Sequence, residues 1–150
     1  MSFYHILLFI HIISAIIGIG PGFVMTRVIT NVETMSELRH GFKVRKKIHV
    51  FIMIGGTLLL TTGLIMGMMR PSLFREFWYT GSLTLYLIIL AAGPLVLAPI
   101  TKPIKEIMNR HKGDDIPTAY FPLAKRLFFV ERITNIFIAT IIILMILKPF

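Results

Sequence analysis

Residues 4–25 read YHILLFIHIISAIIGIGPGFVM and contain no Asp, Glu, Lys or Arg. At about 1.5 Å per residue, a helix of this length crosses a hydrocarbon core of roughly 30 Å. Such a helix has no charged face to present to water, so its natural surroundings are lipid or other apolar helices. The stretch therefore predicts a transmembrane helix over residues 4–25.

Three further apolar runs follow, at residues 48–69, 77–100 and 127–147. Hydrophobic residues make up 55% of the 150-residue chain and charged residues only 15%, which is too apolar for a soluble domain of this size. We expect an all-α membrane protein whose single domain, residues 1–150, is an antiparallel bundle of four transmembrane helices. The absence of cysteine excludes disulfides and thiolate metal sites.

Basic residues are concentrated on two of the three connections between these runs. They are Arg27, Arg39, Lys43, Arg45, Lys46 and Lys47 on the first connection, and Lys102, Lys105, Arg110, Lys112, Lys125 and Arg126 on the third. The positive-inside rule places both connections in the cytoplasm and both termini outside. We expect these connections to contact anionic lipid head groups. The net charge of the chain is +9, but apolar runs separate the basic residues. They form no continuous basic surface, so we predict no nucleic-acid binding.

One face of residues 4–25 carries small and polar side chains at three- and four-residue steps. These are His11, Ser14, Ala15, Gly18, Gly22 and Met25. Small residues allow a neighbouring backbone to approach closely, and Gly18 and Gly22 form a GxxxG pair. Because the second run has a similar stripe, we predict that the first two helices meet along Gly18/Gly22 and Gly56/Gly63.

His11 lies on this stripe, about seven residues or roughly 10 Å into the apolar layer. An imidazole at that depth is costly unless it has partners, so His11 is the first candidate functional residue. The residues expected at the same depth on the other helices are Thr62, Thr84 and Ile141. Since none of these is a histidine, a haem with two histidine ligands is disfavoured, whereas a haem with His11 as its single histidine ligand remains open. The alternative is a structural His11, hydrogen-bonded to Ser14 or to a hydroxyl such as that of Thr62.

A second polar group is expected near the cytoplasmic side. Glu131, Arg132 and Asn135 lie one or two turns inside the fourth run, with Arg27 and His49 at a similar level. We favour a structural interpretation in which Glu131 pairs with Arg27 and Arg132 extends towards the head groups. The functional alternative is an entry point for protons or anions.

Several short motifs carry a resemblance to known proteins. These motifs are His11-Ile-Ile with Arg27, Lys47-Ile-His49 with the Gly-Gly and Thr-Gly pairs that follow it, and a third apolar run led by Trp78. Together they resemble a superfamily of small four-helix bacterial membrane proteins. It includes the membrane-bound protoporphyrinogen oxidase and the copper-resistance D-type domain. The stretch IHIISAIIGIGPGF resembles most an uncharacterised family of predicted integral membrane proteins.

The resemblance implies a multi-pass protein of the bacterial cytoplasmic (inner) membrane, with haem b as cofactor and His11 as the ligand of the haem iron. In the oxidase a lysine follows the tryptophan of the third span, but residues 77–100 contain no lysine. This departure argues against protoporphyrinogen oxidation and leaves haem or tetrapyrrole binding open.

Two hypotheses follow. The first is a haem- or tetrapyrrole-binding, redox-active membrane protein in which His11, Ser14, Arg27 and His49 contact the cofactor. The second is a non-enzymatic membrane transport subunit or scaffold in which His11 is structural. Both leave open a homo-oligomer or a membrane partner protein.

Overall fold

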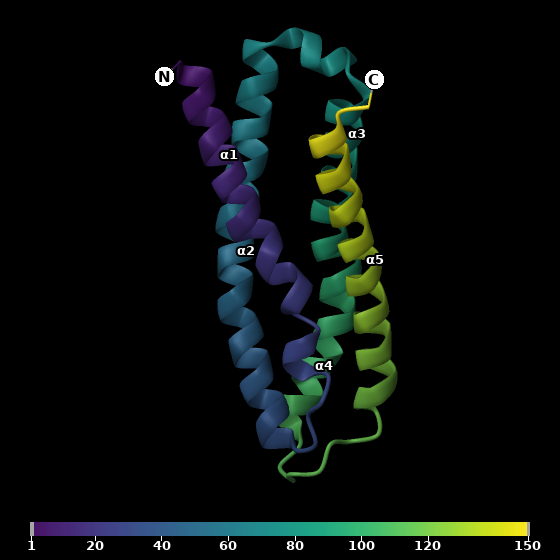
Figure 1. The fold of residues 1–150 in the computed structure, drawn as a ribbon. Coiled ribbons are helices and arrows are strands. Elements are labelled where there is room, and N and C mark those ends of the chain that lie inside the picture. The colour runs from purple at the N-terminus through teal and green to yellow at the C-terminus, as the bar shows by residue number, and fades with distance from the viewer. Residues whose placement is uncertain (1, 150) are drawn as a thin grey trace.

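The computed structural model describes residues 2–149, and this part of the chain is entirely helical, without a β-strand (Figure 1). Four helical stretches are long and apolar enough to cross a membrane: Phe3–Ile29, Met35–Met69, Phe77–Arg110 and Tyr120–Leu147. The predicted four-helix membrane architecture is confirmed. Large apolar side chains such as Phe9 and Phe51 remain 61% and 58% exposed, as expected for helices surrounded by lipid.

The elements in chain order are α1 (Phe3–Ile19), the 3-10 segments η1 (Gly20–Val24) and η2 (Arg27–Ile29), α2 (Met35–Met69), the 3-10 segment η3 (Pro71–Arg75), α3 (Phe77–Ala92), the π-helical segment η4 (Gly93–Leu97), α4 (Ala98–Arg110) and α5 (Tyr120–Leu147). Figure 1 shows both chain termini and η3 at one end of the bundle, here called the termini end. The start of α2, all of α4 and the α4–α5 connection form the opposite end, here called the basic end. That the basic end faces the cytoplasm stays a prediction from the positive-inside rule.

Glycine and proline interrupt the regular α-helix in two of the spans, and in the first of them this shortens the α-helix predicted over residues 4–25. The regular α-helix of α1 ends at Ile19, and the chain continues as the tighter segment η1 through Pro21. Between α3 and α4 the hydrogen bonding becomes π-helical at Gly93–Leu97, a segment that contains Pro94. Proline lacks a backbone N–H, and π-type bonding accommodates the missing bond.

Two helices begin earlier than the apolar runs they contain. Thr34 and Glu37 form a reciprocal capping box that starts α2 at Met35, ahead of the apolar run at residue 48. The α4–α5 connection adds a second cap, because the backbone N–H of Met35 donates a hydrogen bond to the backbone carbonyl oxygen of Asp114 at 2.8 Å. Tyr120, seven residues before the apolar run at residue 127, is the first residue of α5 and is 3% exposed. Both helices therefore extend beyond the apolar layer, and the helical turns that precede their apolar runs carry charged residues.

A compact apolar core fills the basic end. Its buried members are Ile29, Met35, Leu38, Ile100, Ile104, Met108, Tyr120, Ala124 and Leu127. Arg39 closes one side of this core, because its guanidinium donates to the carbonyl oxygen of Met108 at 3.1–3.2 Å and also to that of His111. These carbonyl groups lie at the C-terminal end of α4, where helical carbonyls lack hydrogen-bond partners within the helix. The guanidinium supplies the missing hydrogen bonds, and its positive charge interacts favourably with the negative end of the helix dipole.

The termini half of the bundle is held together by close backbone approach. A Cβ placed on Gly18 would lie 2.6 Å from the backbone nitrogen of Gly56, so α1 and α2 touch here without intervening side chains. This part of the predicted glycine contact is confirmed. The part that involved Gly22 was wrong, since a Cβ there would meet nothing within 4 Å. The reason is that α1 ends before Gly22, and η1 no longer continues its face.

Candidate functional site

His11 on α1 is hydrogen-bonded to Thr62 on α2. The His11 Nδ1 atom and the Thr62 Oγ1 atom are 2.9 Å apart, and Thr62 is buried while His11 is half-buried. The depth argument that paired these residues is therefore confirmed. Thr84, expected at the same depth on the third helix, is exposed, and its hydroxyl donates to the carbonyl oxygen of Thr80.

The position of the Thr62 hydroxyl proton determines the tautomer of His11. Thr62 Oγ1 lies 2.6 Å from the carbonyl oxygen of Leu58 and 3.1 Å from that of Leu59, and it donates its single proton to them. The hydroxyl oxygen can then only accept from His11, which places the imidazole proton on Nδ1. Nε2 carries the lone pair, and no protein group among residues 2–149 hydrogen-bonds it. His11 thus presents an unprotonated ring nitrogen.

The imidazole of His11 packs against α2 at Gly63. A Cβ on Gly63 would lie 3.2 Å from His11 Cε1, so glycine makes room for the ring. Tyr79 on α3 donates its hydroxyl to the Gly63 carbonyl at 3.0 Å, and Tyr86 donates to the Gly56 carbonyl at 2.8 Å. These two hydrogen bonds hold α3 against the face of α2 that His11 contacts.

Ser82 is a polar residue at this level that the sequence analysis missed. It follows Tyr79 by one helical turn on α3 and is 1% exposed. Its hydroxyl has no hydrogen-bond partner among the described residues 2–149. The threonines of the bundle, such as Thr80 and Thr134, donate to a carbonyl four residues back, so the unused hydroxyl of Ser82 differs from them.

A second polar cluster lies within the basic half, where Arg45 on α2 forms an ion pair with Glu131 on α5. Their side chains are only 7% and 11% exposed. Thr26 donates its hydroxyl to Glu131 Oε2 at 2.5 Å, and Arg45 also donates to the carbonyl oxygen of Met25 at 2.5 Å. The cluster joins the end of the first span to α2 and α5.

The predicted partner of Glu131 was wrong, since Arg27 is exposed and Arg45 takes its place. The sequence does contain a signal for Arg45. Leu38, Arg45, Ile52, Leu59 and Met66 recur every seven residues along α2, and three of the four apolar members are buried. A basic residue in phase with an apolar stripe faces the bundle interior.

The four residues predicted to contact a cofactor do not form one site. Ser14 lies one turn from His11, is 2% exposed and sits at the contact between α1 and α2. Arg27 and His49 are exposed at the basic end. Sixteen residues separate His11 from Arg27, which corresponds to about 24 Å of helix. Among the described residues 2–149, no three His, Asp or Glu side chains are grouped so that they could hold a metal ion.

Comparison with known proteins bears on this arrangement. Residues 5–149 match the model of a family described as "Predicted integral membrane protein (DUF2269)". The chain belongs to the DUF2269 family. Both His11 and the Arg45–Glu131 pair lie within the part of this DUF2269 protein that matches. No curated protein and no solved structure matches the chain.

Proposed function

We propose that this DUF2269 protein binds a haem or another metallated tetrapyrrole in the membrane, with His11 as the axial ligand of the metal. The observation that carries the proposal is the His11–Thr62 hydrogen bond, which leaves Nε2 with its lone pair available. Imidazole ligands of metals commonly donate their other N–H to a neighbouring group, which fixes the ring orientation and tautomer. Thr62 serves this purpose here.

Ser82 supports the same assignment. A buried hydroxyl without a partner costs free energy, and a bound group that accepts its proton removes this cost. Ser82 lies one turn from Tyr79, whose hydroxyl bonds the carbonyl of the glycine beneath His11. The site thus offers a ligand nitrogen on α1 and a buried, unused hydroxyl on α3.

The group that pairs with the carboxylates of a tetrapyrrole lies at the termini end. Arg70 stands over the ring of Tyr4, with its Cζ atom 4.0 Å from the ring centroid. Tyr4 precedes His11 by seven residues, or about 10 Å of helix, whereas Arg27 is about 24 Å away. Arg70 therefore takes the role that the sequence analysis gave to Arg27.

In this arrangement the chain supplies binding, orientation and electrostatics. A bound haem would supply one-electron redox chemistry. Thr62 holds the imidazole so that Nε2 stays unprotonated, and the surrounding apolar helices restrict water. The resemblance to the superfamily of the membrane protoporphyrinogen oxidase stays a prediction, and the missing third-span lysine argues against that particular reaction.

The absorption spectrum of protein purified in detergent from haem-replete cells tests the proposal. We expect a Soret band for the unchanged chain and its loss in His11→Ala. The matched control is His49→Ala, which removes an exposed histidine at the basic end and should keep the band. Thr62→Val should keep haem but shift the spectrum or weaken binding by roughly 10- to 100-fold, as loss of a partner behind a metal-ligating histidine does. Colourless unchanged protein would contradict haem binding.

The second candidate is a non-enzymatic transport subunit or scaffold. The same His11–Thr62 bond favours it, because the bond joins α1 to α2 and is worth about 0.6 kcal/mol on average in membrane bundles. Under this alternative the protein is colourless, and His11→Ala and Thr62→Val destabilise it by similar small amounts.

A further inference from the structure

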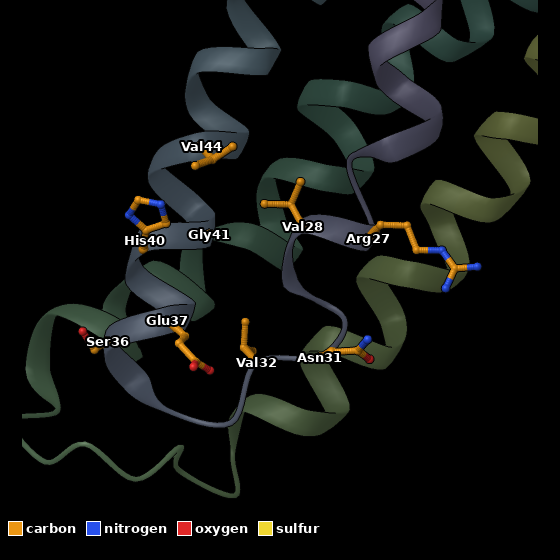
Figure 2. A pocket seen from close by; sticks show the side chains of 9 residues that line it. All are labelled: Arg27, Val28, Asn31, Val32, Ser36, Glu37, His40, Gly41 and Val44. Carbon is orange, nitrogen blue, oxygen red and sulfur yellow. The ribbon is translucent and has the colours of Figure 1, made fainter.

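A groove of about 500 Å³ lies at the basic end, between α2 and the segment that connects it to the first span. Figure 2 shows Val28, Val32 and Val44 along the groove, with His40 and Arg27 projecting on opposite sides of it. The groove is distant from His11, and neither proposed function of His11 makes use of it.

The position of the groove corresponds to the head-group layer of the cytoplasmic leaflet. Its walls come from residues 27–32 and 36–44, directly before the apolar run that begins at Ile48. The apolar floor continues towards the lipid-facing side of α2, where Val50 and Phe51 are 53% and 58% exposed. A molecule in the groove can therefore extend from the head-group layer into the hydrocarbon.

Acidic and basic groups around the groove are separated along α2. Glu33, Glu37 and Asp114 lie at its start, where Asp114 Oδ1 accepts a hydrogen bond from the backbone N–H of Ser36 at 3.2 Å, and the basic residues of α2 lie nearer the apolar run. Arg27 and His40 line the groove, and Lys43 and Lys47 are exposed one and two turns after His40 on the same helix. The acid in the lining, Glu37, is already engaged, because its carboxylate accepts the backbone N–H groups of Glu33 and Thr34 in the cap of α2. The part of the rim nearer the membrane, formed by His40, Lys43 and Lys47, thus attracts an anion.

We propose that this groove binds one anionic phospholipid of the cytoplasmic leaflet. The lipid phosphate contacts Lys43 and Lys47 on the α2 side of the groove, with His40 as a further donor, and the glycerol and first methylene groups lie on Val28, Val32 and Val44. Basic clusters beside membrane helices attract anionic lipids. The valine floor distinguishes this site from one for a free phosphate or a nucleic acid, because such ligands have no alkyl chain to cover it.

Lipid retention measured by native mass spectrometry tests the site. The protein is purified in a neutral detergent and incubated with an equal mixture of phosphatidylglycerol and phosphatidylcholine. We expect one retained phosphatidylglycerol, and Lys43→Gln/Lys47→Gln should lower its affinity about fivefold for each charge removed. Glycerol phosphate, which has the head group without acyl chains, should fail to compete; if it displaces the lipid, the site is one for free anions and the proposal is wrong.

Two further variants separate a built site from general charge attraction. Lys125→Gln/Arg126→Gln removes the same charge from the exposed start of α5 and should retain the lipid. Val44→Trp fills the groove without changing any charge and should lose the lipid. Thermal unfolding of each variant checks that the bundle is intact. Equal losses in both charge variants, or full retention by an intact Val44→Trp protein, would overturn the proposal.

Discussion

The two halves of the bundle are held together in different ways. At the basic end, large apolar side chains such as Ile104 and Leu127 are almost completely buried, and Arg45 and Glu131 form an ion pair among the helices. In the termini half, α1 meets α2 through Gly18, Gly55 and Gly56. There the helices are joined by single hydrogen bonds from side chains such as Tyr79 and Tyr86.

The difference follows from the solvent around each half. The basic end borders water, so burying apolar side chains is favourable, and the helices there pack like a soluble core. In the hydrocarbon layer apolar side chains gain little by leaving lipid, so close backbone contact and hydrogen bonds hold the helices. Polar groups with unused bonding capacity occur in both halves: His11 Nε2 and the Ser82 hydroxyl in the second environment, and the buried Tyr120 hydroxyl in the core of the basic end. We infer that side-chain burial stabilises the basic end, whereas close backbone contact and single hydrogen bonds stabilise the termini half.

The largest effect is expected from breaking the ion pair of the basic half. Arg45→Met leaves Glu131 buried without its partner and should lower the free energy of unfolding by about 3–5 kcal/mol. Reversible unfolding in mixed detergent micelles measures it. The double variant Arg45→Met/Glu131→Leu removes both charges and should recover most of this loss. If the single and double variants were equally unstable, the pair would not be the source of the effect.

A smaller effect is expected from separating α1 and α2 in the termini half. Gly18→Leu places a side chain where the backbone of Gly55 and Gly56 now lies, and it should cost about 1–3 kcal/mol as overpacking does. Gly22→Leu is the matched control, because open space surrounds that position, and it should change stability little. Similar unfolding curves for the two variants would show that the close contact contributes nothing.

The smallest effect concerns an exposed pair at the basic end. His111 Nε2 donates to Asp115 Oδ1 at 3.1 Å, and this hydrogen bond holds the pKa of Asp115 below its ordinary value. A lowered acid pKa stabilises the folded connection above the unfolded pKa, and this contribution is lost as the pH falls through the folded pKa. Titration of Asp115 by NMR should give a pKa that rises towards the ordinary value in His111→Gln. An unchanged pKa in the variant would exclude the hydrogen bond as its cause.

The sequence predicts the membrane helices and the level at which His11 meets Thr62, because both depend on residue counts along regular helices. It did not identify Arg45 as the partner of Glu131. Four basic residues lie close together at Lys43–Lys47, and only the phase of α2, which begins at its cap near Thr34, shows which of them points inwards. The contact expected at Gly22 failed for a related reason, since α1 ends before Pro21.

The most direct test of the account is a ligand-rescue experiment on His11. His11→Gly, purified from haem-replete cells, leaves a space beside Thr62 and Gly63 that free imidazole can enter. We predict a strong Soret band for the unchanged protein, its loss in the variant, and its return when imidazole is added. A variant that keeps the full Soret band without imidazole, or an unchanged protein that has none, would contradict the assignment of His11 as the axial ligand.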